Sequence, residues 1–132
     1  MIDSDCNLMT IYTVLRSNPK NIKIAKKVFS IIQKVAYTVR GKDAILTQIP
    51  EFIRYMAEFL KGNYRESKSL CVDAMCALRN MAAGVYAFKL VHFVNPNEII
   101  PVSIEILRNY RSESQVCAHT CAFLWNISSS SK

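Results

Sequence analysis

The residues best suited to chemistry are two cysteines and a histidine close together near the C-terminus, Cys117, His119 and Cys121. Thiolates and imidazoles are ligands that zinc prefers, and two ligands spaced i, i+4 on a helix can share one ion. His119, however, lies about 200° around such a helix from Cys117, and no second Cys/His pair completes a tetrahedral site. We therefore expect no metal and no cofactor, and we expect these cysteines to be small core side chains.

The remaining titratable side chains do not form a catalytic group. His92 stands among apolar residues without a nearby acid to orient it or a nucleophile in register, which is typical of a structural histidine. The carboxylates are spaced as exposed-face residues rather than as a close pair in an apolar setting. Three glycines are too few for a loop that cradles phosphates. The sequence therefore indicates that this protein is not an enzyme.

Apolar residues recur at three- and four-residue spacing over six segments, which predicts six main helices. These segments are 8–15, 22–37, 49–60, 69–81, 98–110 and 116–127. Residues that can stop or cap a helix lie between them, among them Pro19, Gly41, Gly84 and Pro96. No segment alternates with period two for long enough to be a strand, so we expect an all-α fold.

The chain repeats itself with a period near 46 residues. Residues 78–82 (LRNMA) align with residues 124–128 (LWNIS) at this shift, and the apolar pattern of 24–36 falls on that of 70–82. A period of about 46 with two or three helices per unit is typical of α-solenoids of the HEAT and armadillo kind. We expect three positions to be equivalent and interior: Ile32, Leu78 and Leu124.

Two segments resemble the third helix of armadillo repeats, whose pattern is a small residue followed by Leu-x-Asn-Leu-(Ala/Ser). They are CALRNMA at 76–82 and AFLWNIS at 122–128. The Ile-Pro pairs at 49–50 and 100–101 resemble the start of the second helix, and 86–93 resembles the short first helix. The resemblance implies a right-handed α-solenoid of about three armadillo-like repeats. It places one domain over 1–128, with units of about 6–37, 38–83 and 84–128 and a flexible tail at 129–132; we expect a fragment of a longer array.

Two details narrow the resemblance. Nuclear-import receptors of the armadillo group carry a Trp four residues before the third-helix Asn, but Cys76 and Ala122 stand there in this chain, so we do not expect an import receptor. The segments 77–80, 89–91, 99–102 and 123–126 are similar to the C-terminal part of rotatin-type scaffolds. That likeness implies a place at the centrosome, the centriole or the ciliary base.

Composition and cysteine usage indicate a soluble intracellular domain. Of 132 residues, 51% are apolar and 20% are charged, which suits one folded core and excludes disorder. Charged residues interrupt every apolar stretch before the ~18 residues that a membrane span needs. Five cysteines is an odd number, and four of them lie in helical patterns, which suits reduced thiols. We expect a cytoplasmic location.

The formal net charge of +7 is concentrated in the first third of the chain. Between Cys6 and Lys42 the sequence has eight cations and no acid: Arg16, Lys20, Lys23, Lys26, Lys27, Lys34, Arg40 and Lys42. On a helix over 21–36, apolar residues can face the core while the lysines face water. If this is a third helix, the resemblance implies that its polar side lines a concave groove. The alternative is an ordinary solvated face.

These observations favour a non-enzymatic scaffold for protein–protein interaction that binds an acidic or amphipathic segment in the groove or at an open end of the solenoid. The predicted partner-binding residues are Lys27, Ser30, Lys34, Arg79, Asn80, Trp125 and Asn126. The two asparagine amides can bond a ligand backbone or cap a neighbouring carbonyl. Self-association through the repeat ends stays open. The alternative function is binding of nucleic acid or an anionic surface by the basic first third, which we disfavour because no exposed aromatic residues are interleaved for base stacking.

Overall fold

The computed structural model describes residues 4–130, with side chains described from residue 8 to residue 129. Within this range the chain folds into eight helices and has no strand. They are α1 (Ser4–Ser17), α2 (Ile22–Val35), α3 (Val39–Gln48), α4 (Phe52–Asn63), α5 (Lys68–Met81), α6 (Tyr86–Leu90), α7 (Pro96–Asn109) and α8 (Ser114–Ser130). The predicted all-α class is confirmed.

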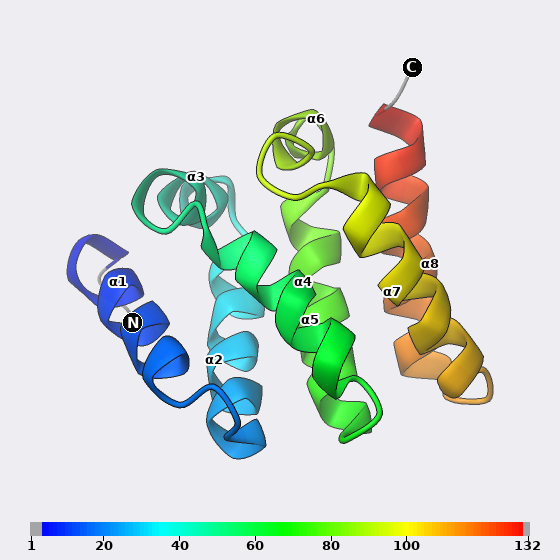
Figure 1. The fold of residues 1–132 in the computed structure, drawn as a ribbon. Coiled ribbons are helices and arrows are strands. Elements are labelled where there is room, and N and C mark those ends of the chain that lie inside the picture. The colour runs from blue at the N-terminus through cyan, green and yellow to red at the C-terminus, as the bar shows by residue number, and fades with distance from the viewer. Residues whose placement is uncertain (1–3, 131–132) are drawn as a thin grey trace.

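The helices lie in two layers with two shorter helices across one side (Figure 1). Helices α2, α5 and α8 form the rear layer, and α1, α4 and α7 form the front layer, while α3 and α6 are seen nearly end-on at the top (Figure 1). The most extensive contacts between helices join α2 to α5 and α5 to α8. One end of the molecule is therefore formed by α1 and α2, and the opposite end by α7 and α8.

The helix bounds follow the 46-residue spacing of the sequence. Helices α2, α5 and α8 begin at Ile22, Lys68 and Ser114, each 46 residues after the one before. The first two begin with the same device, because the side chains of Asn21 and Ser67 accept the backbone N–H three residues later. Such N-caps satisfy a donor that has no partner inside the helix. Equivalent sequence signals therefore begin equivalent helices.

Aromatic side chains join the first layers of helices through edge-to-face contacts. The ring centroid of Phe52 on α4 lies 5.8 Å from that of Tyr12 on α1 and 6.1 Å from that of Phe29 on α2. Phe59 on α4 lies 5.7 Å from Phe29. Such pairs add about 0.5–1.5 kcal/mol each beyond the burial of their apolar area. Helix α4 is thereby packed against both α1 and α2.

Gly41 is not a helix breaker, so that prediction is wrong. It lies inside α3, and its N–H donates to the side chain of Thr38, the N-cap, at 3.0 Å. Helix α3 passes so close to the end of α2 that a Cβ on Gly41 would lie 1.7 Å from the carbonyl oxygen of Val35. The glycine is needed for this close approach of two backbones rather than for a turn.

The C-terminal helix differs from the prediction in length and in burial. Helix α8 continues to Ser130, past the predicted end at Ile127, and the last two residues of the predicted tail lie outside the described residues. Ile32 and Leu78 are fully buried, as expected of interior positions, whereas Leu124 is only partly buried. The reason is that no helix of the described chain lies beyond α8 to cover it.

Candidate functional site

One surface brings together most of the predicted partner-binding residues. It is built by three positions on each of α2, α5 and α8, and we call these nine residues the ladder: Lys27, Ser30 and Lys34; Asp73, Cys76 and Asn80; His119, Ala122 and Asn126. Their spacing of three and four residues puts them on one face of each helix. Each of the nine side chains is partly or fully exposed, and none is buried.

Hydrogen bonds between neighbouring helices hold the ladder in register. Nδ2 of Asn80 on α5 donates to the carbonyl oxygen of Gln33 on α2 at 3.0 Å. Nδ2 of Asn126 on α8 donates in the same way to the carbonyl oxygen of Arg79 on α5, at 3.3 Å. Gln33 and Arg79 lie 46 residues apart, as do the two asparagines. Of the two roles considered for these amides, the structure thus gives their nitrogens the packing role.

The cysteine of the ladder adds a second contact at the same junction. The thiol of Cys76 donates to the side-chain oxygen of Gln33 at 3.4 Å, and burial raises the pKa of this thiol. A thiol that stays protonated at neutral pH is a poor nucleophile and a poor metal ligand. Cys76 is therefore part of the packing between α2 and α5. Gln33, which the sequence did not single out, receives both bonds.

The charge of the ladder is mostly positive on α2. Burial raises the pKa of Asp73 on α5, and the cations Lys26 and Lys34 on α2 lower it in part. Lys27 and Lys34 are exposed, and Lys26 is partly exposed. With one carboxylate opposed by three lysines, this part of the surface keeps an excess of positive charge.

An arginine–histidine contact links α5 to α8. Nη1 of Arg79 lies 3.2 Å from Nδ1 of His119. Because a guanidinium can only donate, Nδ1 is the acceptor and the proton of the neutral ring is on Nε2. Burial lowers the pKa of His119, Arg79 lowers it further, and Asp73 opposes the shift. The histidine is therefore kept neutral at pH 7, and Arg79 supplies the positive charge at this junction.

Trp125 lies at the end of this row of contacts. It follows Gln33 and Arg79 at the 46-residue spacing, no helix of the described residues packs beyond α8, and its side chain is 72% exposed. Six of the seven predicted partner-binding residues thus lie on or beside the ladder junctions, and Trp125 lies at the free edge of α8.

Lys42 does not belong to the basic surface predicted for the first third of the chain. Its side chain is only 6% exposed, and its ammonium group donates to the carbonyl oxygen of Tyr37 at 3.2 Å. The ammonium nitrogen also lies 5.7 Å from the ring centroid of Tyr86, and burial lowers its pKa. Its charge is therefore not available to an external anion, because the aromatic ring and the carbonyl already solvate it.

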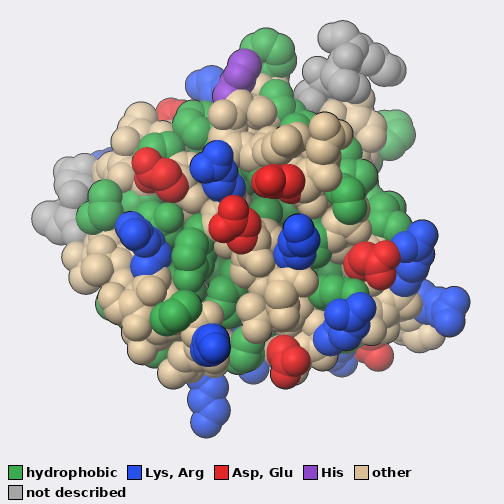
Figure 2. Space-filling view, in the orientation of Figure 1, with side chains coloured by type: hydrophobic (Ala, Val, Ile, Leu, Met, Phe, Trp, Pro, Cys, Tyr) green, Lys and Arg blue, Asp and Glu red, His purple; other side chains and the backbone are tan. Residues whose placement is uncertain are grey.

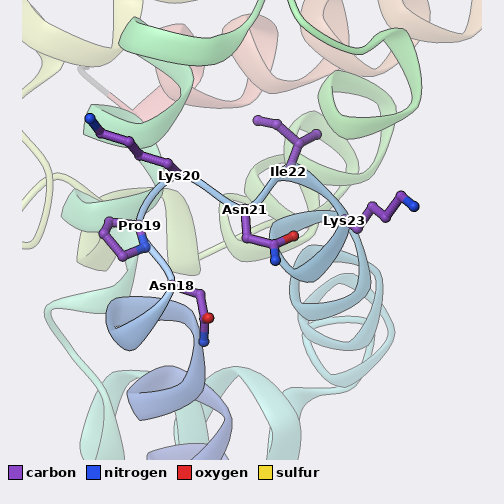
Figure 3. Close-up of a pocket in the computed structure, with 6 residues that line it drawn as sticks. All are labelled: Asn18, Pro19, Lys20, Asn21, Ile22 and Lys23. Carbon is purple, nitrogen blue, oxygen red and sulfur yellow. The ribbon is translucent and has the colours of Figure 1, made fainter.

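The turn between α1 and α2 forms a shallow depression of about 610 Å³ (Figure 3). Lys20 and Lys23 both line it, but they point in different directions, away from its centre (Figure 3). Asn21 is occupied as the N-cap of α2, and Asn18 donates to the carbonyl oxygen of Val14 at 2.8 Å. The depression therefore has no converging donors for a phosphate, and it offers no support for a nucleic-acid site.

A second hollow lies between α1 and α2 and is largely apolar. It has a volume of about 550 Å³, and its lining includes Ile11, Val14, Ile24, Lys27 and Ile31. The sequence did not single it out, because isolated apolar residues on a predicted helix face are normally assigned to the core. Within the described residues, no other helix covers this face of α1 and α2.

The front layer of the molecule has a different character. Lys and Arg side chains are mixed there with Asp and Glu side chains over α4 and α7 (Figure 2). Arg108 and Glu105 form an ion pair on α7. A surface of mixed charge has no preference for a partner of one sign, which makes this layer a suitable control surface.

The cysteine–histidine cluster that could have held zinc is dispersed. The thiol of Cys117 donates to the carbonyl oxygen of Tyr110 at 3.3 Å, and this side chain is partly buried. Cys121 is exposed, so the prediction that it is a core side chain is wrong; no helix of the described chain packs over this face of α8. Over the part of the chain that the structure describes, no three His, Cys, Asp or Glu side chains are grouped so that they could hold a metal ion. Likewise, none of the helices in that part is long and apolar enough to cross a membrane.

Comparison of the chain with family models, with curated proteins and with solved structures found no match to any of them. The function is therefore inferred below from the geometry and the charge of the surfaces described above.

Proposed function

We propose that this chain is an armadillo-like repeat module that binds an acidic protein segment along the ladder and catalyses no reaction. The observation that carries the proposal is the repeated amide bond between neighbouring helices, from Asn80 to Gln33 and from Asn126 to Arg79. It keeps the polar faces of α2, α5 and α8 in one row. A continuous polar row across three helices is a surface that an extended peptide can follow.

Other contacts that recur at 46 residues support three stacked repeats in a right-handed α-solenoid. The thiol of Cys71 donates to the carbonyl oxygen of Tyr64 at 3.3 Å, and the thiol of Cys117 donates to that of Tyr110 at the same distance. Repeats of this kind stabilise one another in series, because each buries its apolar face against the next. The helix bounds and these bonds follow the same period.

The charge of the ladder selects the chemistry of the partner. The exposed lysines of α2 and the guanidinium of Arg79 can each donate hydrogen bonds to a carboxylate of the partner. His119 is neutral, so it adds no charge to this surface. Asp and Glu side chains of an extended segment, spaced to meet α2 and α5 in turn, complement this pattern. We therefore propose an acidic segment as the partner.

Peptide selection on the wild-type protein tests the proposal. A displayed library of random 15-residue peptides is selected on the immobilised chain, and enriched peptides are measured by fluorescence polarisation at near-physiological salt. We expect acidic peptides, and we expect the double variant Lys27→Glu/Lys34→Glu to weaken their binding at least about tenfold, which is about 1.4 kcal/mol. Asn80→Ala is not a suitable probe, because it also removes a bond that joins α2 to α5.

A matched control separates the ladder from net charge. The double variant Arg54→Glu/Lys61→Glu makes the same change in charge on exposed residues of α4, in the front layer. It should leave the affinity within about twofold of wild type, apart from weak long-range electrostatics. Equal losses in both double variants would contradict a binding site on the ladder. Binding of labelled DNA or RNA tighter than about 10⁻⁶ M at this salt would favour the nucleic-acid alternative instead.

The cellular form of the proposal is a scaffold of the centriole or the ciliary base, which rests on the resemblance of four short segments to rotatin-type proteins. A fluorescently tagged chain should then lie with a centriole marker in dividing or ciliated cells. The ladder double variant should be diffuse if the acidic partner recruits the chain. A diffuse wild-type chain would contradict this location while leaving the peptide-binding test unaffected.

A further inference from the structure

The C-terminal end of the molecule exposes positions that are buried earlier in the chain. Four positions on α2 are fully buried, and so are the four that follow them by 46 residues on α5: Ala25, Phe29, Ile32 and Ala36, then Cys71, Met75, Leu78 and Ala82. On α8 the same positions are partly or fully exposed: Cys117, Cys121, Leu124 and Ser128. The difference arises because the next helices cover α2 and α5, and nothing in the described chain covers α8.

Apolar side chains of the neighbouring helices extend this exposed edge. Trp125 is 72% exposed, Phe88 on α6 is 64% exposed and Ile100 on α7 is 37% exposed. Phe88 follows the buried Lys42 by 46 residues, and Lys42 is covered by Tyr86 of α6. We call this surface the C-terminal edge; its large or reactive side chains are Phe88, Ile100, Cys121 and Trp125, which are exposed, and Leu124, which is partly exposed. Large exposed aromatic and aliphatic side chains gathered on one edge are typical of an interaction surface.

The N-terminal end exposes positions that are buried later in the chain. Thr10, Ile11 and Val14 on α1 are partly or fully exposed, whereas the residues 92 positions later on α7 are buried: Val102, Ser103 and Ile106. Ile24 and Ile31 on α2 are partly exposed, while their counterparts on α5 and α8 are buried: Leu70 and Ala77, then Val116 and Phe123. These exposed residues line the apolar hollow of about 550 Å³ between α1 and α2, which we call the N-terminal groove.

Each interior junction of the molecule is thus made of one surface like the C-terminal edge and one like the N-terminal groove. The two junctions inside the chain, α2 with α5 and α5 with α8, use both halves. At the ends of the described chain, the C-terminal edge and the N-terminal groove are each left without the surface that covers their counterparts in the interior. The step that carries α5 onto α8, applied once more, brings the α1–α2 pair of a second molecule onto the free edge of α8.

We propose that copies of this chain associate head to tail, with the C-terminal edge of one copy seated in the N-terminal groove of the next. The proposal rests on the repeat arrangement of the proposed function but needs no acidic ligand. Because the two surfaces differ, the contact is heterologous and does not close on itself as a two-fold dimer does. Association therefore produces linear chains whose length grows with concentration.

Charge and aromatic chemistry at the new junction are complementary. Inside the chain, Arg79 contacts His119. At the junction between two copies, the residue equivalent to Arg79 is Trp125, and the residue equivalent to His119 is Lys27 of the second copy. A lysine over the face of a tryptophan is an attractive cation–π pair. Residues 114–129 of α8 contain no Asp, Glu, Lys or Arg, so no like charge opposes the lysines of the incoming groove.

Sedimentation velocity over a wide range of protein concentration, with a reducing agent to exclude disulfides through Cys121, tests the proposal. We expect the weight-average sedimentation coefficient of the wild-type chain to rise with concentration past the value of a dimer. Trp125→Lys blocks the C-terminal edge, because it sets a like charge against Lys27 of the next copy, and Val14→Glu blocks the N-terminal groove. Both side chains are exposed, at 72% and 43%, so each variant should fold and sediment as a monomer.

Sedimentation of a mixture of the two blocked variants distinguishes a head-to-tail contact from other modes of association. Each retains the surface that the other lacks, so an equimolar mixture should form a 1:1 dimer and nothing larger. Tyr37→Glu is the matched control, because Tyr37 is a 77% exposed aromatic residue whose counterparts Ala83 and Ser129 are also exposed, and it should associate like wild type.

Three results would overturn the proposal. The first is a wild-type chain that stays monomeric at every concentration. The second is a plateau at the dimer, which indicates a two-fold contact. The third is a mixture of blocked variants that stays monomeric. Failure of acidic-peptide binding with association intact would remove only the ladder function, so the two proposals fail separately; Lys34→Glu, a ladder variant outside the groove lining, should retain association.

Discussion

Substitution of Gly41 by alanine tests the close approach of α2 and α3 that positions the cationic helix. The new Cβ would lie 1.7 Å from the carbonyl oxygen of Val35, 2.7 Å from its carbonyl carbon and 3.0 Å from its Cγ1. Two of these three atoms belong to the backbone at the end of α2, so no change of rotamer relieves the clash. Helix α3 must move away by more than an ångström, or the last turn of α2 must open.

The expected loss follows from opposing contributions. Alanine is better than glycine inside a helix by about 1 kcal/mol. Overpacking of a filled site costs about 1–3 kcal/mol and sometimes more, and a displaced turn also exposes its backbone groups. Because the clash is with backbone atoms, we take the overpacking cost at the upper end of its range and expect a net loss of about 2 kcal/mol in the free energy of unfolding, which for a domain of this size lowers the Tm by roughly 6–10 °C.

Gly62 provides the matched control, because a Cβ added there meets nothing within 4 Å. It lies inside α4, is exposed, and should gain about 0.5–1 kcal/mol on substitution by alanine. Urea unfolding followed by circular dichroism measures both variants. If Gly41→Ala unfolds within about 0.5 kcal/mol of wild type, then α3 does not pass over the end of α2 as described.

Three further predictions concern burial and protonation. Leu78→Ala should cost about 2–5 kcal/mol and Leu124→Ala about 1 kcal/mol, because only the first side chain is fully buried; urea unfolding measures both. Burial and then Arg79 lower the pKa of His119 in the folded state, so below about pH 6.5 the unfolded chain binds more protons than the folded chain and stability is lost as pH falls. His119→Gln removes this contribution and should flatten the rise of the unfolding free energy between pH 5 and about 6.5. Iodoacetamide at pH 8, mapped by mass spectrometry, should label the exposed Cys121 and spare Cys71, whose pKa burial raises to about 12.

Each of these predictions has a result that contradicts it. Equal costs at Leu78 and Leu124 would mean that α8 is covered by something the described chain does not contain. A His119→Gln variant with an unchanged pH profile would mean that the histidine is solvated. The pH profile is read above the range in which Asp73 titrates, because burial raises the pKa of that carboxyl and its contribution has the opposite sign. Rapid labelling of Cys71 would mean that the packing around this thiol, including its bond to the carbonyl oxygen of Tyr64, opens readily.

The sequence predicted the helical class and the spacing of the helices because both depend on periodic patterns. Apolar residues three and four apart specify the helices locally, and the structure adds that Asn21 and Ser67 are the N-caps of two of them. The same patterns recurring after 46 residues specify which helices are equivalent. Neither inference needs contacts between residues far apart in the chain.

Features that depend on such contacts were not predicted or were predicted wrongly. Gly41 resembles a helix breaker in the sequence, and only its distance to Val35 shows that it permits two backbones to approach. Lys42 counts as a surface cation until Tyr37 and Tyr86 are found to enclose its ammonium group. These side chains take their roles from neighbouring elements, which local sequence patterns do not encode.

The candidate site was predicted in part for the same reason. Helical spacing was enough to place Lys27, Lys34 and Asn80 on exposed faces of two equivalent helices. It could not show that the asparagine amide is bonded to the carbonyl of Gln33, a residue 47 positions earlier, because that depends on how α5 lies against α2. The sequence left self-association through the repeat ends open, and only the comparison of burial between equivalent positions showed which side chains the two ends of the described chain expose.

An NMR titration of the ¹⁵N-labelled chain with an acidic peptide from the selection tests the central claim most directly, because it locates the bound segment on the surface. Ladder binding predicts that shifted amide signals concentrate on the polar faces of α2, α5 and α8 around Lys27, Lys34, Asp73 and Asn80. Shifts confined to α4 and α7, or scattered over no continuous surface, would contradict it.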